Sequence, residues 1–144
     1  MIEKPSDLQF NEISIGQKKT FEIKITEEMV ENFADFSGDY NPLHLDPVFA
    51  RSTPYGETIA HGMLILGHIS DMMIQEFGHY WISNGKLKIR FKAPVFIPSE
   101  IFTYGEIRKI VTESQTSLVE CLIGCRDQTG KEVIRGDAYI SLKQ

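Results

Sequence analysis

The sequence has few cysteines, no long apolar run and no excess of positive charge, and each absence excludes a class of protein. Its 15 Lys and Arg are outnumbered by 20 Asp and Glu, which gives a net charge of -5. The basic surface needed for nonspecific nucleic-acid binding is therefore missing. The longest apolar run, residues 63–66, is far shorter than the roughly 20 residues that span a bilayer. We expect neither nucleic acid nor a membrane among its partners.

The two cysteines, Cys121 and Cys125, fall in a stretch typical of a β-strand. Four positions along a strand span about 13 Å, which is too far for a disulfide. Residues 1–5 include Glu3, Lys4 and Pro5, which interrupt any apolar core of a secretory signal. Both observations indicate a cytoplasmic protein.

The length and composition indicate one globular domain. The chain has 144 residues, of which 42% are hydrophobic and 24% charged. A chain of this length buries roughly two thirds of its unfolded surface. We see no repeat, linker or low-complexity segment, so we predict a single domain over residues 1–144.

Apolar periodicity predicts several strands and two helices. The first helix starts after Thr26, a capping residue, and ends at Ser37. The second covers residues 62–77 and is apolar around much of its circumference, so we expect it to be buried on most sides. Strands are expected from alternation or from β-branched and aromatic content at residues 20–25, 87–91, 101–111, 117–126 and 132–142.

Two further segments are interpreted from local composition. Residues 9–17 are expected to form a short edge strand or an extended arm, and Asn84-Gly85 is a strong turn signal. A buried helix among strands needs a sheet around it. We therefore predict an α+β protein in the hotdog arrangement, an antiparallel sheet wrapped around a buried central helix. A sheet this small leaves an edge strand exposed.

Residues 36–46 concentrate the side chains that can transfer protons. Asp39 and His44 lie five positions apart, a spacing that does not share a helix face, and Pro42 pushes Asn41 out of the α region. We expect a stiff loop there, ending where Pro47 starts a short helix. An acid and an imidazole held together can exchange protons near neutral pH. Without further context the pair is also compatible with an ordinary turn.

Residues 37–44, with Ala60-His61-Gly62-Met63 downstream, resemble the hydratase motif of the MaoC-like family, the R-specific enoyl-CoA hydratases. The resemblance begins near Phe10, includes residues 91–96 and covers nearly the whole chain. It implies the hotdog fold and a homodimer. It also implies an acyl thioester substrate, carried by coenzyme A or an acyl carrier protein, with no other cofactor.

The resemblance implies hydration of a trans-2-enoyl thioester to the (R)-3-hydroxyacyl thioester, or the reverse dehydration. Asp39 and His44 would act on one water, with Asp39 as base and His44 as acid. The opposite assignment stays open, because coupled groups titrate as a pair. Gly62 begins the second helix, where free N–H groups converge, and would donate to the thioester oxygen. The substrate-binding residues that we expect in addition are Asn41, His61, Ser70 and Met73.

Several alternatives remain open from the sequence. The same fold hosts acyl thioesterases, and it could also serve as a non-catalytic module that binds acyl thioesters. His61 and His68 have no third convergent ligand, so we expect no metal. The physiological direction, the acyl chain length and the carrier are not specified by the residues.

Overall fold

The computed structural model describes residues 13–143, and within them five helices accompany five strands. The helices are α1 (Glu27–Ser37), α2 (Pro42–Leu45), α3 (Pro47–Arg51), α4 (Gly62–Phe77) and α5 (His79–Asn84). The strands are β1 (Lys18–Ile25), β2 (Lys86–Phe91), β3 (Ser99–Glu113), β4 (Thr116–Asp127) and β5 (Glu132–Lys143).

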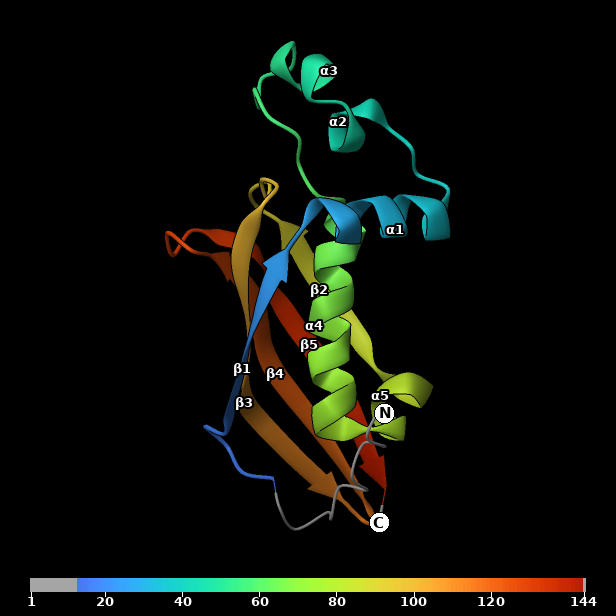
Figure 1. Ribbon diagram of the computed structural model, residues 1–144. Helices are drawn as coiled ribbons and strands as arrows, with labels where there is room; N and C mark the ends of the chain where they lie inside the picture. The colour runs from blue at the N-terminus through green and yellow to red at the C-terminus, as the bar shows by residue number, and fades with distance from the viewer. Residues whose placement is uncertain (1–12, 144) are drawn as a thin grey trace.

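The strands form one antiparallel sheet in the order β1-β3-β4-β5-β2. One face of this sheet is apolar, because alternate residues such as Ile101, Ile123 and Ile140 point to the same side and are buried. Helix α4 lies along that face (Figure 1) and contributes Ile65, Ile69, Met72, Met73 and Phe77 to the core. The structure confirms the predicted antiparallel sheet packed against a central helix.

The expectation that α4 is buried on most sides is wrong for one stripe of the helix. Met63, Gly67, Asp71 and Gln75 follow one another at a spacing of four residues and are exposed. Asp71, which would be an unusual charge in a buried helix, therefore faces solvent and accepts a hydrogen bond from Gln75. Only the opposite side of α4 packs on the sheet.

The predictions for residues 9–17 and for Asn84-Gly85 need correction. Residues 13–17 contain no strand but a turn, in which Gln17 N–H donates to Ser14 O, and residues 9–12 lie outside the described part of the chain. Asn84 ends α5 instead of opening a hairpin turn. Its side chain bonds both the N–H and the carbonyl of Ser141, and this contact with a distant strand overrides the local Asn-Gly signal.

The segment between α1 and α4 carries the candidate site. Thr26 caps α1 by accepting from Met29 N–H, and Gly38 ends the helix with a φ of 78° that favours glycine. Helices α2 and α3 then stand beyond one end of the sheet, above the N-terminus of α4 (Figure 1). Among the described helices, none is both long enough and apolar enough to cross a membrane.

Candidate active site

His44 lies on a helical turn, where the sequence predicted a loop. Asn41 is the N-cap of α2 and its side-chain oxygen accepts from Leu43 N–H at 3.0 Å, while Pro42 occupies the first turn. The fixed φ of proline suits that position, so the residue that breaks a helix elsewhere starts one here. Asn41 itself stays outside the helical region, as predicted, with φ -55° and ψ 127°. Asn41 thus shapes the backbone between Asp39 and His44, and its contact with substrate stays a prediction.

Asp39 and His44 face each other without a direct hydrogen bond. Asp39 Oδ2 lies 3.9 Å from His44 Nε2, and the two side chains are 53% and 11% exposed. On its other side, the His44 ring places Nδ1 2.6 Å from the carbonyl oxygen of Ile59. A carbonyl can only accept, so Nδ1 carries a proton and donates it. Nε2 of a neutral His44 therefore presents its lone pair toward the carboxylate.

The separation of 3.9 Å suits a shared small molecule better than a direct bond. Direct hydrogen bonds to oxygen or nitrogen require about 2.7 to 3.2 Å. One water oxygen about 2.8 Å from each atom fits between them. The pair can thus exchange protons with one water from two sides.

His61 connects these two residues. It is 2% exposed, and its ring stacks on His44 with centroids 3.9 Å apart and planes inclined by 27°. His61 Nε2 lies 2.9 Å from the main-chain oxygen of Asp39, and Phe33 packs against its ring at 4.9 Å. His61 Nδ1 has no hydrogen-bond partner within the part of the chain that the structure describes.

Asp39, His44 and His61 each offer a potential metal ligand, and these atoms lie within 4.8 Å of one another. Their orientation does not favour an ion. The two imidazoles lie face to face, and Nε2 of His61 is engaged by the Asp39 carbonyl. A tetrahedral metal needs lone pairs that converge on one point.

Gly62 is the first residue of α4, where N–H groups have no intrahelical partner. It lines a groove of about 430 Å³ with Phe91, Lys92 and mostly apolar neighbours. A side chain at Gly62 would also meet Phe91, since an added Cβ would lie 3.0 Å from Phe91 Cε1. Glycine therefore has two roles at this position. It leaves its N–H accessible, and it lets the Phe91 ring pack against the N-terminus of α4.

Ser70 and Met73 lie outside the cluster of Asp39, His44 and His61. Ser70 Oγ accepts from Trp81 Nε1 at 3.0 Å, and Met73 is buried in the core. At 1.5 Å per residue, Ser70 lies about 12 Å along α4 from Gly62. Their contact with substrate stays a prediction.

Sequence reasoning missed two contributors, Ile59 and Phe33. The Ile59 carbonyl sets the tautomer of His44 through a backbone atom, for which no residue pattern exists. Phe33 could have been noticed, since it lies on the apolar side of α1 one turn before the site.

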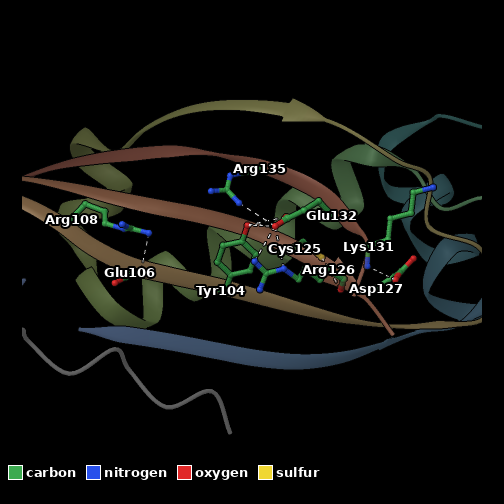
Figure 2. Close-up of polar contacts among 9 residues, drawn as sticks. All are labelled: Tyr104, Glu106, Arg108, Cys125, Arg126, Asp127, Lys131, Glu132 and Arg135. Atoms are coloured by element: carbon green, nitrogen blue, oxygen red, sulfur yellow. Dashed lines mark hydrogen bonds and ion pairs between the residues drawn. The ribbon is translucent and has the colours of Figure 1, made fainter. Parts of the chain in front are cut away.

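A second polar cluster lies on the outer face of the sheet, near the hairpin that joins β4 and β5. Glu132 accepts from the Tyr104 hydroxyl at 2.9 Å and from both Arg126 and Arg135, as Figure 2 shows. Arg126 also stacks over the Tyr104 ring. Tyr104 crosses Gly124 to reach Glu132, and a Cβ there would lie 2.3 Å from the hydroxyl.

The titration of this second cluster is shifted by its contacts. Burial, with the hydrogen bond to Glu132, raises the pKa of Tyr104 to about 12. Burial alone would raise the pKa of Glu132, but the hydrogen bonds from Tyr104 and Arg126 and the nearby guanidinium charges outweigh it and lower that pKa below its usual range. Tyr104 is thus held neutral and Glu132 is held ionised at neutral pH.

An antiparallel sheet packed on one helix, with an acid and an imidazole above that helix's N-terminus, defines a hotdog protein with a site for proton transfer. The model of the MaoC-like domain matches residues 10–124, and the chain belongs to this family.

Two of the proteins that are similar to the chain are named for an activity. The (R)-specific enoyl-CoA hydratase of Aeromonas caviae is 31% identical over 131 residues, covering 90% of the chain and 96% of that relative. The 3-hydroxybutyryl-CoA dehydratase of Methylorubrum extorquens is 29% identical, covering 94% of the chain and 84% of the relative. The solved structure of the (R)-hydratase from A. caviae superposes with a TM-score of 0.80 at 28% identity, covering 90% of the chain and 97% of that structure.

Proposed function

We propose that the chain hydrates a trans-2-enoyl thioester to the (R)-3-hydroxyacyl thioester, or catalyses the reverse dehydration. The observation that carries this proposal is the 3.9 Å separation of Asp39 Oδ2 and His44 Nε2 beside the N-terminus of α4. Membership of the MaoC-like family supports it, as do relatives named for a hydratase and for a dehydratase.

In the proposed hydration, Asp39 removes a proton from the water while the water oxygen bonds to C3 of the substrate. The C2–C3 double bond supplies the electrons for an enolate, and His44 as an imidazolium donates a proton to C2. Asp39 passes its new proton to His44 to complete the cycle.

The enolate oxygen needs a donor, and Gly62 is the proposed one. Its N–H lies at the first turn of α4, where the helix dipole is positive. The groove of about 430 Å³ that Gly62 lines has mostly apolar walls, which suits part of an acyl thioester. Removing one such donor typically costs about 10² to 10³ in rate.

The carrier of the acyl group is proposed to be coenzyme A or an acyl carrier protein, and the mechanism uses no further cofactor. We place the reaction in the cytoplasm, supported by two buried free thiols, Cys121 and Cys125. We assign residues 1–144 to one domain.

The proposed assembly is a homodimer. Within residues 13–143, β1 and β2 are the edges of the sheet, and an unpaired edge tends to pair with another chain. Met63 in the first turn of α4 and Phe91 at the end of β2 are 60% and 55% exposed, and exposed apolar surface is typical of protein interfaces when it forms a patch. Light scattering coupled to gel filtration measures this state, and a monomer at micromolar concentration would contradict it.

The function is tested by following the ultraviolet absorbance of an enoyl-CoA thioester. We expect the absorbance to fall on addition of protein and to stay constant with Asp39→Asn or His44→Asn. Asn at position 44 can still donate to Ile59 O, so it removes only Nε2. His79→Gln is the matched control, because His79 is exposed on α5.

Other products would contradict the proposal. Release of free thiol without loss of the double bond would indicate a thioesterase, and tight binding without turnover would indicate a binding module. Oxidation of the product by an R-specific dehydrogenase tests its stereochemistry, and an S product would contradict the proposed facial selectivity.

A further inference from the structure

We propose that His61 is a positioning residue, held neutral, that fixes Asp39 and His44 relative to each other and stabilises the protonated form of His44. This inference rests on the proposed function for its consequence in catalysis. Its structural basis is independent of activity: one buried ring contacts the main chain of one residue of the pair and the side chain of the other.

The hydrogen bonds assign the tautomer of His61. The Asp39 carbonyl can only accept, so His61 Nε2 carries the proton and donates it at 2.9 Å. Nδ1 is buried and, among the described residues, has no partner. A second proton on Nδ1 would place an unsolvated positive charge in the interior, which is costly. His61 should therefore remain neutral when His44 is protonated.

The stack couples His61 to the charge on His44. The two ring centroids lie 3.9 Å apart, so the face of neutral His61 lies against the His44 ring. An aromatic face attracts a cation, whereas a second cation would repel it. Neutral His61 thus favours the imidazolium that the proposed acid requires.

Other charged groups face His44 as well. Asp39 approaches Nε2 from the preceding loop, and Glu27 and Glu31 of α1 line the same small cavity of about 90 Å³ as His44. All three carboxylates are unchanged when His61 is replaced. A change in His44 titration in a His61 variant therefore reports the loss of the ring.

Two substitutions separate the contacts of His61. His61→Gln keeps an amide N–H that can reach the Asp39 carbonyl but removes the ring. His61→Phe keeps a ring against His44 but removes the donor. Matched control variants are His68→Gln and His79→Gln, on α4 and α5 away from the cluster.

The primary measurement is the ¹⁵N imidazole spectrum during a pH titration. In the unsubstituted protein we expect His61 to stay neutral with its proton on Nε2, while His44 titrates from a form protonated on Nδ1. In His61→Gln the midpoint of His44 should fall by about half a pH unit or more. In His61→Phe it should change less, because a ring remains.

Turnover provides the second measurement. Both variants should lower kcat at least about tenfold with KM changed less than about threefold, because misplaced groups slow the chemical step more than binding. In His61→Phe the loss follows from the freed Asp39 carbonyl. Circular dichroism confirms that each variant is folded, and His61→Phe tests the proposal if His61→Gln does not fold.

Three outcomes would overturn the inference: His61 titrating like a solvent-exposed histidine, an unchanged His44 midpoint in His61→Gln, or wild-type kcat in both variants. If the unsubstituted protein fails to hydrate enoyl thioesters, the proposed function fails. The spectra still decide whether His61 is neutral and supports the charge on His44.

Discussion

The two polar clusters of this protein each contain a carboxylate, but its surroundings are opposite in kind. Around Glu132, the acceptor oxygens are satisfied by Tyr104, Arg126 and Arg135 at 2.9 to 3.3 Å. Around Asp39, the carboxylate and the His44 Nε2 stop 3.9 Å apart. The first arrangement stabilises a fixed structure, whereas the second leaves reactive atoms available to a third group.

The difference lies in what orients each side chain. The Glu132 network is held by contacts between the charged atoms themselves, so those atoms are no longer available. In the Asp39 cluster the orienting contacts use the Ile59 carbonyl, the Asp39 carbonyl and ring stacking. A reactive pair can thus be rigid without being neutralised. The comparison predicts that substitutions in one cluster change activity and in the other change stability.

The largest effect is expected for Asp39→Asn. The amide cannot accept a proton from water, so kcat should fall about 10³-fold. Asparagine can still accept from Asn41 N–H, as Asp39 Oδ1 does at 3.2 Å, and the side chain is half exposed. The unfolding free energy should therefore change by less than about 0.5 kcal/mol. Asp35→Asn, a neighbouring exposed carboxylate, is the control and should retain activity.

A smaller effect on activity is expected at Gly62. Two variants, Gly62→Pro and Gly62→Ala, both add a Cβ, but only the proline removes the backbone N–H. Gly62→Pro removes the N–H at the first position of α4, where proline is tolerated, and His61 at ψ 132° suits a following proline. We expect a loss of about 10²-fold in kcat. Gly62→Ala keeps the donor and meets only the exposed Phe91 ring, so it should lose less than about tenfold. Equal losses in the two variants would assign Gly62 to packing alone.

Much of the scaffold around the site follows from local sequence, and the structure shows why. The apolar pattern from Gly62 to Phe77 and the glycine stop at Gly78 predicted α4 with its observed bounds. Alternation, or a high content of β-branched and aromatic residues, predicted each strand of the sheet to within two residues. These signals succeed because burial on one face repeats along a single element.

The missed features depend on contacts between distant residues. Helix α2 has four residues, too few for a period, so His44 was expected on a loop. His61 and Asp39 are 22 positions apart, and their contact arises from the fold alone. The motif residues could be named from sequence, but the stack of His61 on His44 could not, since no spacing encodes a ring-to-ring contact between the N-cap of α4 and α2.

The next prediction concerns the second cluster. Glu132→Gln should lower the unfolding free energy at pH 7 by about 1 to 2 kcal/mol, because two guanidinium groups and Tyr104 lose a charged acceptor. Hydratase activity should be unchanged. Glu106→Gln, which breaks the single ion pair with Arg108 seen apart from the network in Figure 2, should cost less than about 0.5 kcal/mol.

The difference in unfolding free energy between the wild type and Glu132→Gln should depend on pH, because folding lowers the pKa of Glu132. The pKa of Glu132 is lower in the folded protein than its ordinary value of about 4.3, so its contribution is present above that value. It is lost as pH falls through the folded pKa. Urea denaturation at pH 7 and pH 3 should show the two proteins diverging at neutral pH and converging in acid. If the two proteins still differ in unfolding free energy at pH 3, the effect of the substitution comes from the shape of the side chain at position 132 and not from its charge.

The smallest effect should appear in alkali with Tyr104→Phe. The folded pKa of about 12 lies above the ordinary value of about 10, so between these values the unfolded chain ionises while the folded Tyr104 stays neutral. This favours unfolding as pH rises. Burial also raises the pKa of Cys121 and Cys125 to about 12, and these thiols weaken the fold in alkali in both proteins. The difference in unfolding free energy between wild type and Tyr104→Phe, measured from pH 9 to pH 11, therefore isolates the phenol. It should shift in favour of the variant as pH rises, and parallel curves would show that burial and the bond to Glu132 do not hold the Tyr104 proton.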